Sequence, residues 1–202
     1  MMFLRVNDGE SEIVVKRSRF IAVARGISSR DEAKAVAVEL KKLHRDARHV
    51  CYAFIVDDIG REFGYDDDGE PQGTAGKPIY TALSGANARR SMVAVVRYFG
   101  GIKLGAGGLT HAYRDSADSV IEKAGLSGFE VRSAYSVECD GDVYKKIQPL
   151  LRNMGCTQES IVYNARVSFT VVCKRETDVI AALSPLGATV LYIGERIVNS
   201  ET

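Results

Sequence analysis

Residues 91–125 read SMVAVVRYFGGIKLGAGGLTHAYRDSADSVIEKAG. The first eight residues are mostly apolar and β-branched, which predicts a buried strand. Glycines then crowd residues 99–108. From Leu109 to Ala124 apolar and small residues recur at helical spacing, and Gly125 is placed to end that helix. A strand, a glycine-rich connection and a helix therefore form the centre of a first α+β domain.

The residues before this stretch complete that domain. Ser29 and Glu32 form a capping box, which predicts the start of a helix. We expect residues 57–77 to be rich in loops and the whole domain to cover residues 1–128. The other predicted elements are strands at 13–15 and 19–24 around a Lys-Arg-Ser-Arg turn, a strand at 49–56 buried on both faces, a short strand at 62–65 and a short helix at 78–86.

The remaining residues predict a second fold. Their elements follow the order β-α-β-β-α-β, which is the ferredoxin-like arrangement. We expect this domain over residues 130–202, joined to the first near residues 129–133, with Pro149 kinking or shortening its first helix. The predicted elements are strands at 134–139, 157–163, 165–173 and 189–193 and helices at 142–154 and 176–183, with a hairpin at Asn164. The fold class is therefore α+β, with two domains.

Composition excludes several classes of protein. Apolar residues make up 46% of the chain and charged residues 26%, which is typical of a packed globular protein. No apolar run reaches the roughly 18 residues that span a bilayer, so we expect no membrane partner and a cytoplasmic location. The four cysteines are scattered in apolar runs without a C-x-x-C pair, which indicates buried thiols rather than disulfides or a zinc site.

Charge is unevenly distributed, although the net charge is only +1. Residues 57–70 hold seven acids and one base, whereas residues 71–114 hold six bases and no acid. An acidic edge beside a basic surface would follow, unless the two segments simply neutralise each other.

The candidate site is formed by two glycine-rich blocks, the first at residues 65–78 and the second at residues 97–110. Nine of the nineteen glycines lie between Gly69 and Gly108. Glycine allows left-handed turns or close backbone approach, and a glycine-rich helix start offers free N–H groups to phosphate. We expect both blocks at one rim of the first domain. The alternative is a tight connection without ligand, locked by ion pairs. The predicted anion or nucleic-acid ligands are Lys77, Arg97, Lys103, Arg114, Gly105, Gly107 and Gly108, and the predicted rim is His49, Asp67, Asp68 and Glu70.

Enzyme motifs give little support to catalysis. The sequence contains no G-x-x-x-x-G-K-[ST], no G-x-G-x-x-G, no G-x-S-x-G and no H-E-x-x-H. The adjacent aspartates at 66–68 lack the spacing of an EF-hand, so neither a metal nor another cofactor is expected. His49 and Cys51 alternate on one face of a strand, where a core thiol beside a hydrogen-bonded histidine is favoured over a nucleophile.

Both blocks resemble the IMPACT/YigZ family. The resemblance lies in residues 67–78 and 96–109, and residues 16–21 and 49–53 fit the same family. One departure is His111, where that family's pattern leads us to expect arginine. The resemblance implies that the first domain has a ribosomal-protein-like fold, which is also the fold of a translational GTPase domain. It implies that the second domain is similar to the ferredoxin-like domains of elongation factor G. It also implies a link to translation, since eukaryotic relatives restrain the kinase that reports amino-acid starvation.

These observations favour a non-catalytic binding protein whose partner is RNA, the ribosome or a translation factor, with no specificity for DNA. The acid-free basic segment carries Tyr80, Tyr98 and Phe99, and single-stranded nucleic acid is held by basic grooves with aromatic platforms. Two alternatives remain open. One is a small hydrolase that uses the acids as general base or metal ligands. The other is a protein-interaction adaptor that uses the ferredoxin-like sheet.

Overall fold

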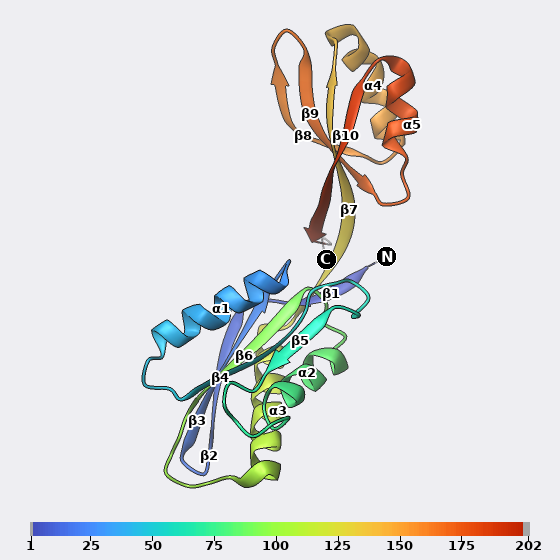
Figure 1. Cartoon of the computed structure of the whole chain (residues 1–202). Coiled ribbons are helices and arrows are strands. Elements are labelled where there is room, and N and C mark those ends of the chain that lie inside the picture. Colours follow the sequence, from blue (N-terminus) through green and yellow to red (C-terminus); the bar gives the residue numbers. More distant parts are fainter. Residues whose placement is uncertain (1, 200–202) are drawn as a thin grey trace. The chain divides into compact units, whose positions relative to one another are not determined.

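The structure is a computed structural model that describes residues 2–199 (Figure 1). Contacts divide the chain into two compact units, one covering Met2–Gly128 and one beginning at Phe129. Both units mix strands and helices, so the predicted α+β fold class is confirmed. Each unit is described by itself below.

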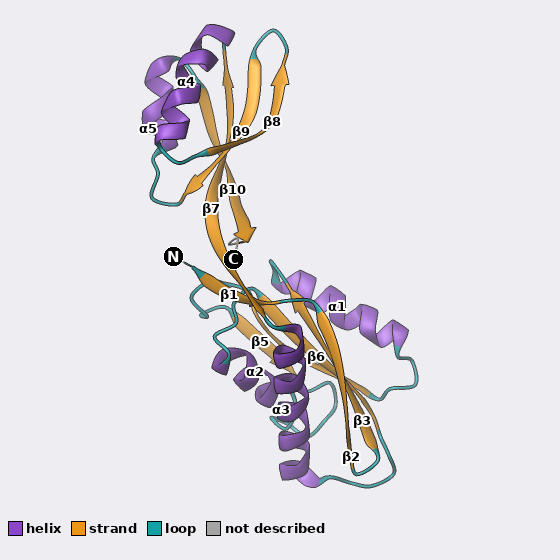
Figure 2. Ribbon diagram, turned by 180° about the vertical axis from the view of Figure 1, so that it is seen from behind, coloured by secondary structure: helices purple, strands orange, loops and turns teal. Residues whose placement is uncertain are grey.

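The first unit is a sheet covered by helices on both faces (Figure 2). Its sheet order is β2-β3-β6-β4-β5, and every neighbouring pair is antiparallel. Helix α1 covers one face, and α2 and α3 cover the other. The elements are β1 (Phe3–Val6), β2 (Gly9–Val15), β3 (Ser18–Gly26), α1 (Arg30–Leu43), β4 (His49–Ile55), β5 (Phe63–Asp66), α2 (Gly76–Gly85), β6 (Ser91–Tyr98) and α3 (Gly105–Ala124).

Strand β6 explains how the sheet separates its two cores. Met92, Ala94 and Val96 pack with α1, whereas Val93 and Val95 pack with α2 and α3. This is the two-residue alternation of a strand that is buried on both faces. The same alternation carries the next residue of the second set, Arg97, toward α2 and α3.

Local sequence sets several boundaries. The Ser29 hydroxyl accepts a hydrogen bond from the Glu32 amide at 3.1 Å, as the capping box predicts. Lys16 and Arg17 form the turn between β2 and β3, with φ of 45° and 67°. Positive φ at both central residues is the geometry of a tight hairpin turn whose twist matches that of the strands.

Two helices begin earlier than predicted. Helix α2 starts at Gly76 rather than at residue 78, and α3 starts at Gly105 rather than at Leu109. The glycines at 105, 107 and 108 are therefore the first turn of a helix and not a connecting loop. Their low helix propensity hid this turn from the sequence pattern.

The second unit has the ferredoxin-like order and topology. Its antiparallel sheet runs β10-β7-β9-β8, with α4 and α5 in the two crossovers. Its elements are β7 (Leu126–Cys139), α4 (Gly141–Asn153), β8 (Thr157–Tyr163), β9 (Val167–Lys174), α5 (Val179–Leu183), a 3-10 turn at Ser184–Leu186 and β10 (Thr189–Asn199).

Residues 129–133, where the two domains are predicted to join, lie inside the continuous strand β7, and contacts divide the chain between Gly128 and Phe129. One expectation about this part of the chain needs correction. Helix α4 runs through Pro149 to Asn153 and does not end early. Pro149 is exposed, so water can satisfy the carbonyl group that its missing N–H leaves unpaired.

No helix within residues 2–199 is both long and apolar enough to cross a bilayer.

Candidate functional site

The two glycine-rich blocks meet at one end of the first unit's sheet. Strand β5 runs antiparallel to β4, with Asp66 opposite Tyr52, so the chain that leaves β5 travels toward His49. Strand β6 ends beside the same residue, because Arg97 is the register partner of His49. The segment before α2 and the segment before α3 therefore leave the sheet at the same end.

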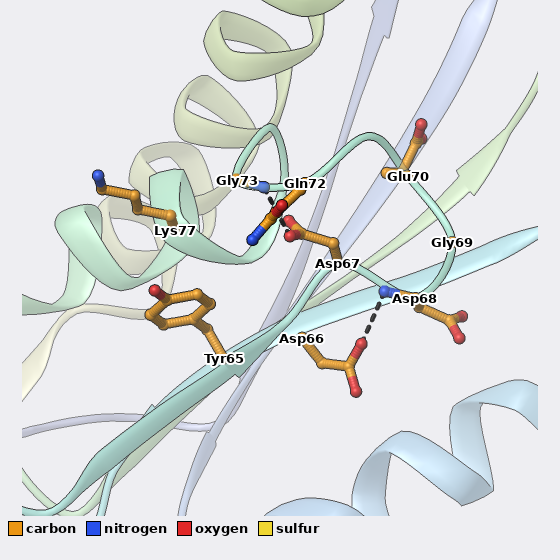
Figure 3. Close-up of a pocket in the computed structure, with 9 residues that line it drawn as sticks. All are labelled: Tyr65, Asp66, Asp67, Asp68, Gly69, Glu70, Gln72, Gly73 and Lys77. Carbon is orange, nitrogen blue, oxygen red and sulfur yellow. Dashed lines mark hydrogen bonds between the residues drawn. The ribbon is translucent and has the colours of Figure 1, made fainter.

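Asp67 organises the first block (Figure 3). Its Oδ2 accepts a hydrogen bond from the Gly73 amide at 2.7 Å. Its Oδ1 accepts from the amides of Ala75 at 3.0 Å and Gly76 at 2.8 Å. These are N–H groups at the start of α2, where a carboxylate also matches the positive end of the helix dipole. Asp67 is therefore the cap of α2, although it lies nine positions before that helix.

Asp68 ties the same loop to the neighbouring elements. Its Oδ2 accepts from the Val50 amide at 2.7 Å, and its Oδ1 pairs with the Lys41 ammonium group at 2.5 Å. That hydrogen bond raises the pKa of Lys41. The backbone carbonyl of Asp68 accepts a hydrogen bond from Nδ1 of His49 at 2.8 Å, which fixes the orientation of the imidazole ring.

Glu70 joins the first block to the second. Its Oε1 accepts from Nη1 of Arg97 at 2.5 Å and from the Tyr113 hydroxyl at 2.8 Å. The side chains of Glu70 and Arg97 are only 4% and 7% exposed. In Figure 3 Glu70 points away from Asp66, on the opposite side of the loop. Arg97, one of the predicted anion ligands, is buried, since its strand position places it beneath the loop.

A hollow of about 370 Å³ lies between the two blocks, and we call it the Phe99 hollow. Its polar lining comes from Arg48, His49, Glu70, Arg97 and Lys103. Its apolar lining comes from Pro71, Phe99, Leu104 and Leu109, and Gly105 and Ala106 of α3 complete it. The hollow thus combines cationic groups, an apolar wall and the first turn of a long helix.

The first turn of α3 is open to ligands. Leu104 precedes it without supplying a side-chain cap, and the turn contains no acid. Gly105, Ala106 and Gly107 are exposed. Helix N-terminal amides with no side-chain acceptor attract anions, because the amide hydrogens and the helix dipole both present positive charge.

The other predicted ligands lie elsewhere. Lys77 lines an acidic hollow of about 550 Å³, formed with residues 65–70, Gln72 and Gly73, and also a separate hollow of about 300 Å³ with Arg114. Lys77 therefore does not share one depression with Arg97 and Lys103, because it is the second residue of α2 rather than part of the loop. Gly107 and Gly108 belong to the first turn of α3 but line neither hollow.

Two glycines in these blocks serve close packing. An ideal Cβ on Gly76 would lie 2.8 Å from the carbonyl oxygen of Asp66, and one on Gly100 would lie 2.0 Å from the carbonyl carbon of Arg17. The Gly100 amide also donates to the Ser18 hydroxyl at 3.2 Å. Part of the glycine content therefore reflects packing of the chain on itself rather than contact with a ligand.

Cys51 belongs to the core beneath the site. Its thiol lies 3.0 Å from the carbonyl oxygen of Asp67 and 3.4 Å from the Tyr113 hydroxyl, and it is fully buried. Burial raises the pKa of Cys51 and also that of Tyr113. A thiol held in its neutral form is a poor nucleophile. Within residues 2–199, no group of three or more His, Cys, Asp or Glu side chains is placed to hold a metal ion.

Sequence reasoning missed Arg48, Tyr113 and Lys41. Tyr113 was assigned to the apolar face of α3, but its hydroxyl group gave no signal of a partner in the first block. Arg48 directly precedes the His49 strand, so its position was visible, but it lies outside both glycine-rich blocks. Lys41 lies 27 positions from Asp68, and no local pattern links residues at that separation.

Comparisons with known proteins agree with this fold. Residues 16–121 match the family profile described as the Impact N-terminal domain. The chain is 36% identical over 171 residues to the IMPACT family member YvyE of Bacillus subtilis, covering 84% of this chain and 79% of that protein. It is 35% identical over 139 residues to the IMPACT family member YigZ of Escherichia coli, covering 68% of each. A crystal structure titled only as that of a hypothetical protein aligns with a TM-score of 0.70 and 29% identity, over 95% of this chain and 97% of that one.

Proposed function

The chain belongs to the IMPACT family, and we propose that it is a non-catalytic binding protein that regulates translation by holding RNA at the Phe99 hollow. The link to translation, and with it a cytoplasmic location, rests on the family resemblance. The choice of RNA rests on the site. A single observation carries it, namely that the exposed cations Arg48 and Lys103 lie beside the uncapped first turn of α3.

Phosphate is the anion that suits this arrangement. Lys103 and Arg48 supply charge, and the amides of Gly105 and Ala106 supply directed donors. The only carboxylate in the lining is Glu70, whose Oε1 already accepts from Arg97 and Tyr113. The lining therefore has a surplus of positive charge, which favours a polyanion.

Three of the four carboxylates of the first block, those of Asp67, Asp68 and Glu70, are occupied in ways that weigh against the hydrolase alternative. Asp67 accepts three backbone N–H groups, Asp68 accepts from Val50 and Lys41, and Glu70 accepts from Arg97 and Tyr113. A general base needs a lone pair directed at a substrate proton. These acids instead hold the loop in place.

The salt dependence of binding to a short single-stranded RNA tests this proposal. Each phosphate contact on a single strand contributes about 0.7 to the slope of log affinity against log salt concentration. Lys103→Ala and Arg48→Ala should each weaken binding and lower that slope. Lys123→Ala, at the exposed far end of α3, is the matched control and should change neither. An affinity that does not change with salt concentration, or that all three substitutions lower equally, would contradict the proposal.

A protein-interaction adaptor is the second candidate, and one observation favours it. Leu191, Tyr192 and Ile193 are consecutive exposed residues on β10, and Leu191 is 64% exposed. Among the described strands β10 pairs only with β7, so it is an edge that another chain can extend. Crosslinking in cells, with both RNA and protein partners identified, separates the two candidates. Crosslinks to RNA from residues 97–106 favour the first, and crosslinks to one protein from β10 favour the second.

A further inference from the structure

We propose that the Phe99 hollow holds one unpaired nucleotide of the RNA, with its base stacked on Phe99 and its phosphate at the first turn of α3. This inference rests on the proposed RNA-binding function and adds the kind of RNA, which is single-stranded.

Phe99 is the platform for the base. Its side chain is 44% exposed, although it follows directly on a buried strand. The Arg97 guanidinium carbon lies 5.6 Å from the centroid of the Phe99 ring and also 5.6 Å from that of Phe20. The guanidinium thus contacts a buried ring and an exposed one. A base on the open side of Phe99 would use the exposed part of this ring as a stacking platform.

Arg97 adds positive charge to the hollow and leaves part of its hydrogen-bonding capacity unused. Its side chain is 7% exposed and lines the hollow, yet Nε has no hydrogen-bond partner within residues 2–199. Glu70 contacts the guanidinium through Oε1, which it shares with the Tyr113 hydroxyl, instead of through a two-oxygen fork. A ligand in the hollow would meet only the small exposed part of the Arg97 side chain, and the positive charge of that side chain favours an anion there.

The phosphate has its own place, separate from the ring. Gly105 and Ala106 line the hollow at the uncapped start of α3, and Lys103 is exposed next to them. The apolar wall, formed by Pro71, Leu104 and Leu109 with Phe99, suits a base and not a second phosphate. The lining therefore offers both an apolar surface and anion-binding groups, the two kinds of contact that a nucleotide needs.

Size and chemistry select an unpaired nucleotide. A volume of about 370 Å³ admits one small ligand but not a double helix. In a duplex the bases are paired and stacked inside, so none is available to an aromatic platform. The hollow that contains Arg114 provides a contrast, because its lining includes two cations and two threonines but no aromatic ring.

The test uses the full chain and a labelled short single-stranded RNA. Phe99→Leu keeps an apolar side chain but removes stacking, and its affinity should fall about 5- to 150-fold, the range that stacking of one base spans. Phe99→Tyr keeps the ring and should retain affinity. Phe63→Leu is the matched control, because Phe63 is a similarly exposed aromatic residue, 41%, on β5 outside the hollow. The same strand with abasic sites should bind the wild type and Phe99→Leu equally.

The outcomes separate this inference from the function beneath it. If Phe99→Leu binds the single strand as tightly as the wild type while Lys103→Ala binds it weakly, RNA binding stands and the base site is wrong. Equal affinity of the wild type for the single strand and for its duplex would also overturn the base site. If the wild type binds no RNA, both proposals fail.

Should Phe99→Leu unfold, adenosine monophosphate and ribose 5-phosphate are compared on the wild type by NMR. The nucleotide must shift Phe99 ring signals that ribose 5-phosphate leaves unchanged, and shifts that are equal for the two ligands would reject the inference.

Discussion

Arg97 at the end of β6 and Glu70 in the loop before α2 form a buried ion pair that joins the two glycine-rich blocks. Neither side chain is more than 7% exposed, and Tyr113 of α3 donates to the same carboxylate oxygen. Burying two charges costs free energy that their attraction offsets only while both are present. The pair therefore makes the arrangement of the two loops depend on one contact.

Removal of one partner of this pair should destabilise the protein strongly. Glu70→Leu leaves the Arg97 charge buried without a carboxylate, and we expect the free energy of unfolding to fall by about 3–5 kcal/mol. The double variant Glu70→Leu, Arg97→Met should be more stable than either single variant, because no buried charge remains. Urea unfolding monitored by circular dichroism gives these values. Asp118→Ala is the control, since it breaks the exposed Arg114–Asp118 pair and should cost less than about 1 kcal/mol. Equal losses at the two sites would show that the buried pair has no special role.

Asp67→Ala should destabilise α2 and the loop before it. The change removes the acceptor of three backbone amides, those of Gly73, Ala75 and Gly76. A lost helix cap costs about 0.5–2 kcal/mol, and we expect the upper part of that range because three donors lose their partner. Asp67→Asn keeps one oxygen acceptor, so its stability should lie between those of the wild type and Asp67→Ala. The melting temperatures of the variants give this order of stability, and Asp115→Ala, at an exposed position on α3, is the control. A melting temperature for Asp67→Ala equal to that of the control would contradict the capping role.

Two glycine-to-alanine substitutions should have opposite effects. Gly100→Ala places a Cβ close to the Arg17 backbone, so the β2–β3 turn and the loop that contains Gly100 must move apart. The free energy of unfolding should fall by at least about 1–3 kcal/mol. Gly107→Ala meets no atom within 4 Å, and alanine favours the helix, so stability should rise by about 0.5–1 kcal/mol. Chemical denaturation of both variants checks the signs. A stabilised Gly100→Ala would mean that the two segments do not approach as described.

Part of the site was visible in the sequence, and part was not. The alternation of β6 already assigns Arg97 to the face of Val93 and Val95, so its burial follows from residue spacing alone. The role of Asp67 does not, because the capped amides lie six to nine positions later and reach the carboxylate only through the fold of the loop. Local patterns record periodicity, whereas loop contacts depend on where the strands end.

The fold itself was more accessible than its boundaries. The order of elements predicted both sheets, because buried strands and amphipathic helices leave strong periodic signals. The start of α3 was missed, since the glycines of its first turn have low helix propensity and their helical state depends on tertiary packing. The predicted junction near residues 129–133 lies beside the division between Gly128 and Phe129. The continuation of strand β7 across that division was not predicted, because the early residues of β7 carry mixed polar and apolar side chains.

The four cysteines should react slowly with alkylating reagents in the folded protein. All four are buried, and burial raises the pKa of each thiol, that of Cys156 to about 11. Only the thiolate is the nucleophile, so a raised pKa reduces the reactive fraction at a given pH. Iodoacetamide at pH 8, followed by peptide mass spectrometry, should show slow labelling that becomes fast in urea. A cysteine that is labelled equally fast in both conditions would not be buried as described.

A fragment of residues 130–202 should fold cooperatively on its own. The core of the second unit is built from its own elements, with Val137 of β7, Ile147 of α4, Val171 of β9 and Leu183 of α5 fully buried together. A domain with its own core can fold alone, and a chain of this size is expected to be marginally stable. Urea unfolding of the fragment should show a single sigmoidal transition. A fragment from Leu126, which includes the whole of β7, is the comparison, and it tests whether the first residues of the strand add stability. If both fragments are unfolded while the full chain is stable, the second unit depends on the first, and the proposed boundary must be abandoned.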